Sequence, residues 1–350
     1  MDALMLPSNW QRVRLGDVGK PCMCKRVMKH QTTRYGEIPF YKIGTFGNTA
    51  DAFISKKLFL EYKTKYSFPK KGDILISASG TIGRAVIYDG KPAYFQDSNI
   101  VWIDNDETLV KNDFLFYAYS NIKWNTEHTT ILRLYNDNFK NTLIPLPPLN
   151  EQAAIANILS DVDRYLYSLR ALILKKESVK KALSFELLSQ RKRLKGFNQN
   201  WQKVRLGDIA NYLTSNLSAE QITQQGKFKV YDVNNFIGYT DTTFISDKPY
   251  ISIVKDGSVG RVRILPPKTN ILSTMGALIA NHKTTTEFLF YLLSNFDFKN
   301  FTSGSIIPHI YFKDYKEKTI FLPPLNEQIA IANVLSGLDH EIISLKNKKR

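Results

Sequence analysis

Apolar residues recur at alternating steps of four and three between residues 148 and 195, which is the spacing of a heptad repeat. The positions are Ile155, Leu159, Val162, Leu166, Leu169 and Ile173, and the pattern resumes at Leu183 and Leu187. A seam with this period runs along one face of an α-helix. We therefore predict one long helix from Asn150 to Arg191, spanning about 60 Å, whose apolar stripe needs a partner.

A second stripe of the same kind lies near the end of the chain. Its members are Ile331, Leu335, Leu338, Ile342 and Leu345. They predict a helix from Asn326 to Arg350 that is shorter than the first. Both helices meet the globular region between them, so we expect the second helix to return antiparallel along the first and to form a coiled coil with it.

The remaining sequence alternates short β-rich runs with turn residues. Such runs fill 40–46, 72–80, 84–90 and 99–105 in the first half, and 230–236, 250–257 and 261–267 in the second. Glycine, aspartate and asparagine bound them, as is typical of strands joined by turns. A helical pattern follows each set, at 112–125 and at 286–296. Both regions are therefore expected to be α+β.

The two halves repeat each other. The segment NWQRVRLGDV at 9–18 returns as NWQKVRLGDI at 200–209, and 15 of 23 residues at 147–169 recur at 323–345. A repeat of this length marks a structural unit. We expect two similar globular modules, 1–147 and 197–322, joined by a spacer helix at 148–196. A second and truncated helix follows at 323–350.

Charge indicates the kind of partner. The 350 residues carry a formal net charge of +16, and residues 170–195 hold nine Lys or Arg against two Glu. A lysine-rich solvated surface would account for this balance, and so would a polyanion such as nucleic acid. The sequence also lacks a signal-peptide pattern and an apolar run long enough to span a membrane, so we expect a cytoplasmic protein.

Catalytic and metal-binding patterns are not evident. The only cysteines, Cys22 and Cys24, are too few for a tetrahedral metal site, and the histidines are scattered. No phosphate-binding P-loop is present, and the Asp51, Glu61 and Lys63 match to a nuclease pattern is of a kind that arises by chance. We expect no cofactor, no metal and no catalytic residue.

Two glycine loops occupy parallel positions after strand-like runs and are the candidate DNA contacts. The residues chosen are Ser79, Gly80, Thr81 and Arg84 in the first loop, and Lys255, Ser258 and Arg261 in the second. Glycine lets backbone approach a phosphate, while hydroxyl and cationic side chains supply donors. A tight β-turn with a surface arginine is the alternative.

The repeated PPLNEQ segments, the opening WQ-x-V-x-LGD, the two glycine loops and the QDSNIVWI stretch resemble type I restriction–modification specificity (S) subunits, over essentially the whole chain. This resemblance implies that each module is a target recognition domain that reads one half of a split double-stranded DNA sequence. It also implies that the helices set the spacing and bind methyltransferase (M) subunits, and that a restriction and translocation (R) subunit joins for cleavage. The chain itself would be non-catalytic. The short second helix departs from the family pattern.

The length difference between the helices suggests a docking face. Ile155, Leu159 and Val162 would lie beyond the reach of the second helix. Leaving an apolar stripe in water is unfavourable by roughly 25 cal/mol per Å². We expect another chain to cover them, either an M subunit or a second copy through self-association. Two alternatives remain for the function: an enzyme whose catalytic domain lies on a missing segment, and an assembly scaffold that does not bind DNA.

Overall fold

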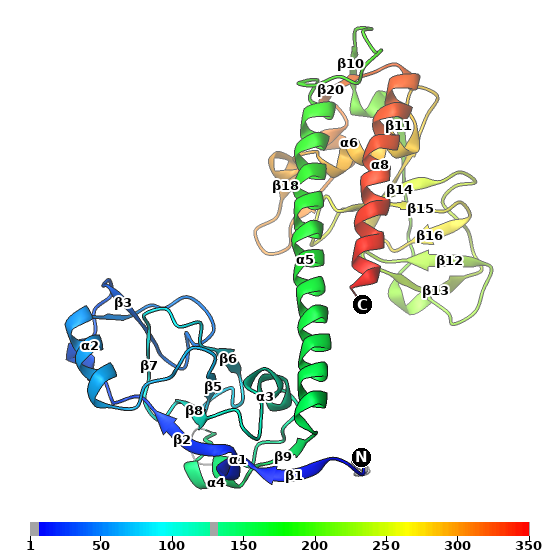
Figure 1. Cartoon of the computed structure of the whole chain (residues 1–350). Coiled ribbons are helices and arrows are strands. Elements are labelled where there is room, and N and C mark those ends of the chain that lie inside the picture. Colours follow the sequence, from blue (N-terminus) through cyan, green and yellow to red (C-terminus); the bar gives the residue numbers. More distant parts are fainter. Residues whose placement is uncertain (1–6, 127–131, 350) are drawn as a thin grey trace. The chain divides into compact units, whose positions relative to one another are not determined.

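The computed structural model describes residues 7–126 and 132–349, which form two compact units, 1–165 and 166–350 (Figure 1). The elements of the first unit are β1 (Gln11–Arg14), α1 (Leu15–Val18), β2 (Gly19–Met23), β3 (Ile38–Tyr41), β4 (Phe53–Ile54), α2 (Lys56–Lys65), β5 (Ile74–Ser77), β6 (Ala85–Ile87), β7 (Tyr94–Phe95), β8 (Ile100–Asn105), α3 (Asn112–Tyr119), α4 (Asn136–Asn141) and β9 (Leu143–Leu146), followed by α5 (Leu149–Leu188).

The first unit is built on a four-stranded antiparallel sheet of order β2-β8-β5-β6. All four residues of β5 are buried, as a strand covered on both faces requires. One face packs with α3 and with the β1–β9 pair, around Phe114, Leu115 and Ile144. The other face packs with the small β4-β3-β7 sheet around Trp102 and Tyr94.

The second unit repeats this topology. Its elements are β10 (Gln202–Arg205), β11 (Ala210–Thr214), β12 (Phe228–Tyr231), β13 (Phe236–Thr240), β14 (Tyr250–Val254), β15 (Val262–Leu265), β16 (Thr269–Ile271), β17 (Met275–Ala280), α6 (Thr286–Ser294), β18 (Thr302–Ser303), β19 (His309–Ile310), α7 (Phe312–Tyr315), β20 (Thr319–Leu322) and α8 (Leu325–Lys348). The sheet orders β11-β17-β14-β15 and β13-β12-β16 match those of the first unit strand for strand. The predicted duplication is therefore confirmed.

Helix α5 is continuous over 40 residues and begins at Leu149, one residue before the predicted start at Asn150. It also ends at Leu188, earlier than the expected Arg191, and Gln190 adopts a positive φ of 60° just beyond. That left-handed residue is a common way to terminate a helix.

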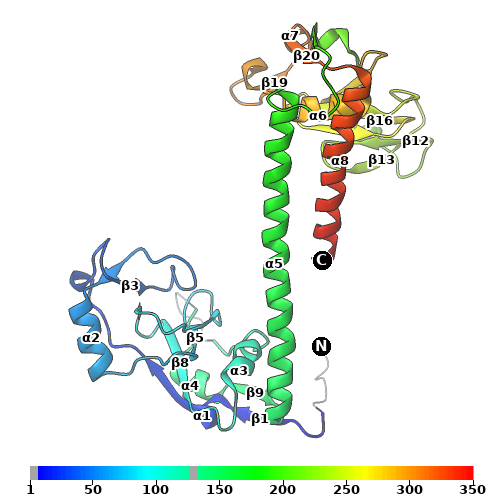
Figure 2. The ribbon, with the colours of Figure 1, turned by 45° about the horizontal axis from the view of Figure 1, so that its top comes forward.

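Helix α8 runs antiparallel to the second half of α5, as Figures 1 and 2 both show. Three ion pairs agree with this direction, because Lys180 lies farther along α5 than Lys176 and Glu177, while its partner on α8 comes before theirs. Lys180 pairs with Asp339 at 2.5 Å, and Lys176 with Glu341 at 2.8 Å. Glu177 pairs with Lys346 at 2.6 Å. The expected α+β modules and antiparallel coiled coil are thus both present.

Candidate functional site

The first glycine loop, residues 79–84, leaves β5 as a tight turn. Gly80 and Gly83 have φ values of 66° and 83°, and the Gly83 amide donates to the Ser77 carbonyl at 2.9 Å. A Cβ on Gly83 would lie 2.2 Å from Nε1 of Trp124. Glycine is therefore required at this position both by the backbone and by the close approach of an aromatic ring.

The side chains of this first loop differ in accessibility. Ser79 is buried, and its hydroxyl donates to Oδ1 of Asn99 at 2.7 Å. Thr81 is exposed. Arg84 is exposed too, but its Nη1 donates to the Phe46 carbonyl at 2.8 Å. Of the residues chosen from the sequence, Thr81 and Arg84 thus present polar atoms at the surface. Ser79 is buried and holds the loop through its hydrogen bond to Asn99.

The second glycine loop, residues 255–261, has the same construction. Gly257 and Gly260 have φ values of 82° and 80°, and a Cβ on Gly260 would lie 2.6 Å from Cδ2 of Phe298. Ser258 and Arg261 are exposed, and Lys255 is half-buried. The two loops are structural equivalents, as their sequences predicted.

A second segment pairs with each glycine loop, and no sequence pattern predicted this pairing. Ser79 forms an isolated β-bridge with Arg133, and Asp256 forms one with His309. His309 Nδ1 also lies 2.7 Å from Asp256 Oδ1. In the second unit this segment carries Ile306, which is 92% exposed. Residues 127–131, just before Arg133, lie outside the described part of the chain.

A basic pocket adjoins the first loop. Its volume is about 520 Å³, and its lining includes Arg26, Lys29, Lys42, Asn99 and Arg133. Two of the cations are held by acids: Arg26 donates to Asp97 at 2.8 Å, and Lys42 lies 2.8 Å from Asp51. The hydrogen bond from Lys42 lowers the pKa of Asp51. The Asp51 carboxylate is therefore the partner of Lys42 in an ion pair at the edge of the basic pocket.

The repeated PPLNEQ motif anchors each long helix to its module. Gln152 Nε2 donates to the Pro147 carbonyl at 2.9 Å, and its Oε1 accepts from the Lys111 amide at 2.8 Å. Gln328 makes the matching bonds, to the Pro323 carbonyl at 2.8 Å and from the Thr285 amide at 3.1 Å. Buried amides that satisfy backbone groups on both sides fix the helix direction.

The glutamate of the same motif accepts a hydrogen bond from a tryptophan side chain in both units. Trp10 Nε1 donates to Glu151 at 2.9 Å, and Trp201 Nε1 donates to Glu327 at 3.0 Å. In the second unit Arg193 adds two further hydrogen bonds to Glu327, from Nε at 3.1 Å and from Nη2 at 2.6 Å. The tryptophan and the PPLNEQ glutamate, which both halves of the sequence repeat, thus form a contact within each module.

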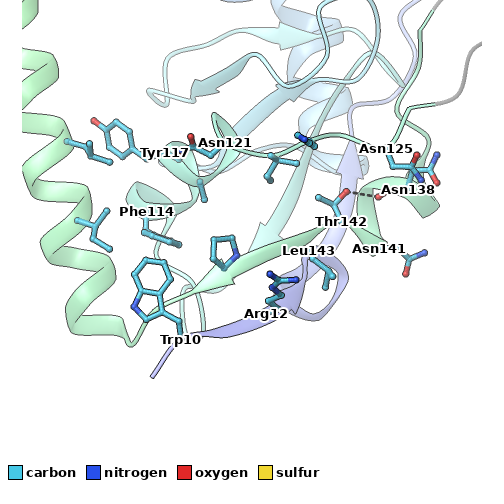
Figure 3. Close-up of a pocket in the computed structure, with 16 residues that line it drawn as sticks. Trp10, Arg12, Phe114, Tyr117, Asn121, Asn125, Asn138, Asn141, Thr142 and Leu143 are labelled. Atoms are coloured by element: carbon cyan, nitrogen blue, oxygen red, sulfur yellow. Dashed lines mark hydrogen bonds between the residues drawn. The ribbon is translucent and has the colours of Figure 1, made fainter. Parts of the chain in front are cut away.

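The predicted docking face lies on the first turns of α5. Leu159 and Val162 are exposed, whereas Ile155 is partly buried against the core of its own module. Ile155 and Leu159 also line a pocket of about 740 Å³. Figure 3 shows Trp10, Phe114 and Tyr117 on the side of this pocket next to α5, with Arg12 and Leu143 farther away.

A model of the type I restriction modification DNA specificity domain matches the chain twice, over residues 7–177 and 198–350. The chain belongs to this family. The first match covers one module and most of α5, and the second covers the other module and α8, so the family unit coincides with the repeat seen in the topology. The predicted family is confirmed.

Known members of the specificity family show how far the likeness extends. A putative type I restriction enzyme specificity subunit of Haemophilus influenzae is 65% identical over 148 residues, which is 42% of this chain and 38% of that protein. The putative MjaX specificity subunit of Methanocaldococcus jannaschii is 27% identical and is matched over 99% of this chain and 90% of its own length. The crystal structure of an S subunit from Mycoplasma genitalium superposes with a TM-score of 0.67 at 21% identity, covering 99% of this chain and 94% of that one, which confirms the fold.

Cys22 and Cys24 are both free thiols and form no disulfide. Cys24 is buried, and its burial raises the pKa of the thiol to about 12. Cys22 is half-buried. Within the described residues, no cluster of three or more His, Cys, Asp or Glu side chains has the geometry of a metal site. Nor does any helix of residues 7–126 and 132–349 have the length and apolarity needed to cross a membrane.

Proposed function

We propose that this chain is the DNA-reading subunit of a type I restriction–modification complex, and that each module reads one half of a bipartite double-stranded target. The observation that carries the proposal is the double match to a DNA specificity domain, one per module. A net charge of +16 suits a phosphate backbone. Methylation and cleavage belong to the partner subunits, and the isolated chain carries out neither.

The DNA-facing surface of each module centres on its glycine loop. Thr81 and Arg84 in the first module, and Ser258 and Arg261 in the second, project from tight turns. The basic pocket beside Ser79 and Asn99 widens this surface in the first module. Gly80 and Gly257 are exposed in these turns, and Lys255 adds a half-buried cation at the start of the second loop. Arginine is the side chain most suited to paired bonds with guanine or phosphate.

The helices serve as spacer and docking platform. We infer the spacer role from α5, which is one continuous helix of 40 residues, since the length of a helix follows from its fixed rise per residue. Ile155, Leu159 and Val162 present an apolar face that M subunits, or a second copy of this chain, would cover. The R subunit joins the assembled complex for cleavage.

Co-expression with the cognate M subunit, followed by genome-wide mapping of methylated bases, tests the proposal. We expect one split motif, with two defined halves and a constant spacer, and no methylation by the purified chain alone. Methyl transfer by the chain without partners would instead favour an enzyme. DNA affinity that does not fall as salt rises would favour a scaffold, because phosphate contacts release counterions.

A further inference from the structure

The segment that pairs with the second glycine loop carries an exposed apolar tip. Ile306 is 92% exposed, more than any other large apolar side chain that the structure describes, and Ile307 beside it is 54% exposed. Single apolar residues at a surface are common and need no explanation. Two adjacent isoleucines next to the candidate DNA contacts are a more specific feature.

The strands below the tip hold it in place. Strands β18 and β19 pair antiparallel, with Thr302 opposite Ile310. Ile310 is 1% exposed and belongs to the core of the second module. Gly304, at the start of the tip, has a φ of 90°, and a Cβ there would lie 2.2 Å from the carbonyl oxygen of Ile307. Glycine is therefore required at this turn, and the isoleucines extend from a tight hairpin.

Backbone hydrogen bonds fasten the same hairpin to the second glycine loop. The Gly257 amide donates to the Pro308 carbonyl, and the Ile310 amide donates to the Lys255 carbonyl, both at 2.9 Å. The loop also carries Arg261, which is exposed. One bonded unit therefore presents apolar and cationic side chains together.

Isoleucine has no hydrogen-bond donor or acceptor in its side chain, which restricts what it can recognise in DNA. The apolar substituent on the base edges of the major groove is the 5-methyl group of thymine, and the other groups that identify a base there are donors and acceptors. The major groove is about 12 Å wide and admits a two-stranded β-ribbon, whereas the minor groove is about half as wide. A hairpin with isoleucine at its tip is therefore suited to a thymine in the major groove.

We propose that Ile306 is a specificity-determining residue, which reads the 5-methyl group of a thymine in the half-site of the second module. Ile307 adds apolar surface beside it, and Lys255 and Arg261 on the fastened loop contact the neighbouring phosphates. Cytosine would be rejected because it carries hydrogen where thymine carries the methyl group. The inference rests on the proposed DNA-reading role and deepens it by naming one base contact.

The test compares thymine with deoxyuridine, which lacks only the 5-methyl group. The full chain with its M subunits is titrated with the duplex that methylation mapping identifies, in which each thymine of the two half-sites is replaced in turn. We expect one position at which deoxyuridine weakens binding of the wild-type complex by about fourfold, because a buried methyl group is lost.

Variants of the chain connect that position to the tip. Ile306→Ala should bind the thymine duplex at least as weakly as the wild type binds the deoxyuridine duplex, and it should not distinguish the two duplexes. Ile306→Val keeps a β-branched apolar side chain and should retain most of the preference. Ile343→Ala is the matched control, because Ile343 is also exposed but lies on α8, and the preference should equal that of the wild type.

Three results overturn this inference and leave DNA reading by the module intact. The first is a wild-type affinity that no deoxyuridine substitution changes. The second is a preference for thymine in Ile306→Ala that equals the wild-type preference at every position. The third is loss of M-subunit binding in Ile306→Ala with that preference unchanged, which would assign the tip to a protein contact. Absence of any sequence-specific binding by the wild-type complex would instead contradict the proposed function itself.

Discussion

Arg193 donates two hydrogen bonds to Glu327, whose side chain is 1% exposed. The arginine follows the end of α5, and the glutamate lies in the first turn of α8. A buried carboxylate without its cation is costly, so this pair holds the chain after α5 onto the second module. Trp201 completes the site from the start of that module.

Removing the cation should therefore destabilise the second module. We expect Arg193→Ala to lower the free energy of unfolding by about 3 kcal/mol, because it leaves the buried Glu327 carboxylate without a cation. Arg191→Ala is the control, since Arg191 is exposed and stacks only over Phe185. Urea denaturation provides the measurement. Adding Glu327→Gln should recover part of the loss, and a double variant less stable than Arg193→Ala would contradict this explanation.

The two glycines of the second loop should respond unequally to alanine. Both have positive φ, but a Cβ on Gly257 meets no atom within 4 Å, whereas on Gly260 it would meet Phe298 at 2.6 Å. We expect Gly260→Ala to cost about 1–3 kcal/mol more than Gly257→Ala, which is the range for overpacking. Thermal and urea unfolding measure the difference. Equal losses would mean that backbone conformation alone requires the glycines.

The loop arginines should contribute to DNA affinity. We expect Arg84→Ala and Arg261→Ala each to weaken binding of the cognate duplex by at least about 1 kcal/mol and to reduce its salt dependence. Arg261 is the cleaner test, because Arg84 also donates a hydrogen bond to the Phe46 carbonyl, so its loss could disturb the fold as well. Arg205→Ala, on β10 and paired with Glu317, is the control for net charge. Unchanged affinity of both loop variants at low salt would reduce the loops to structural turns.

The cysteines should differ in reactivity. Burial raises the pKa of Cys24 to about 12, so almost no thiolate forms at pH 8 and the thiol is shielded from reagents. We expect the Cys22→Ser variant to resist a disulfide reagent at pH 8 until the protein is unfolded. Rapid labelling of that variant in the native state would show that the strand around Cys24 opens readily.

Local pattern predicted the long helices, the duplicated modules and the equivalence of the glycine loops. A heptad seam and a fixed offset are visible in one sequence because they involve residues close together or repeated in order. The ends of α5 were less predictable: the helix stops at Leu188 because Gln190 turns left-handed, and nothing in the apolar period signals that.

Contacts between distant residues were not predictable. The pairing of Ser79 with Arg133, and of Asp256 with His309, joins each loop to a segment about 50 residues away for which no element was predicted. Periodicity placed Ile155 and Leu159 on one stripe, but it could not show that Ile155 packs in part against the core of its own module. Ser79 is bonded to Asn99, which is 20 residues away in the sequence. The exposure of Ser79 could therefore not be judged from the loop alone.

Module exchange tests the central claim most directly. Residues 1–147 would be replaced by the corresponding module of another specificity subunit, the hybrid expressed with the M subunits, and the methylated sites mapped by sequencing. The account predicts that one half of the target changes while the other half and the spacer are retained. A hybrid that changes both halves together, or neither, would contradict the assignment of one half-site to each module.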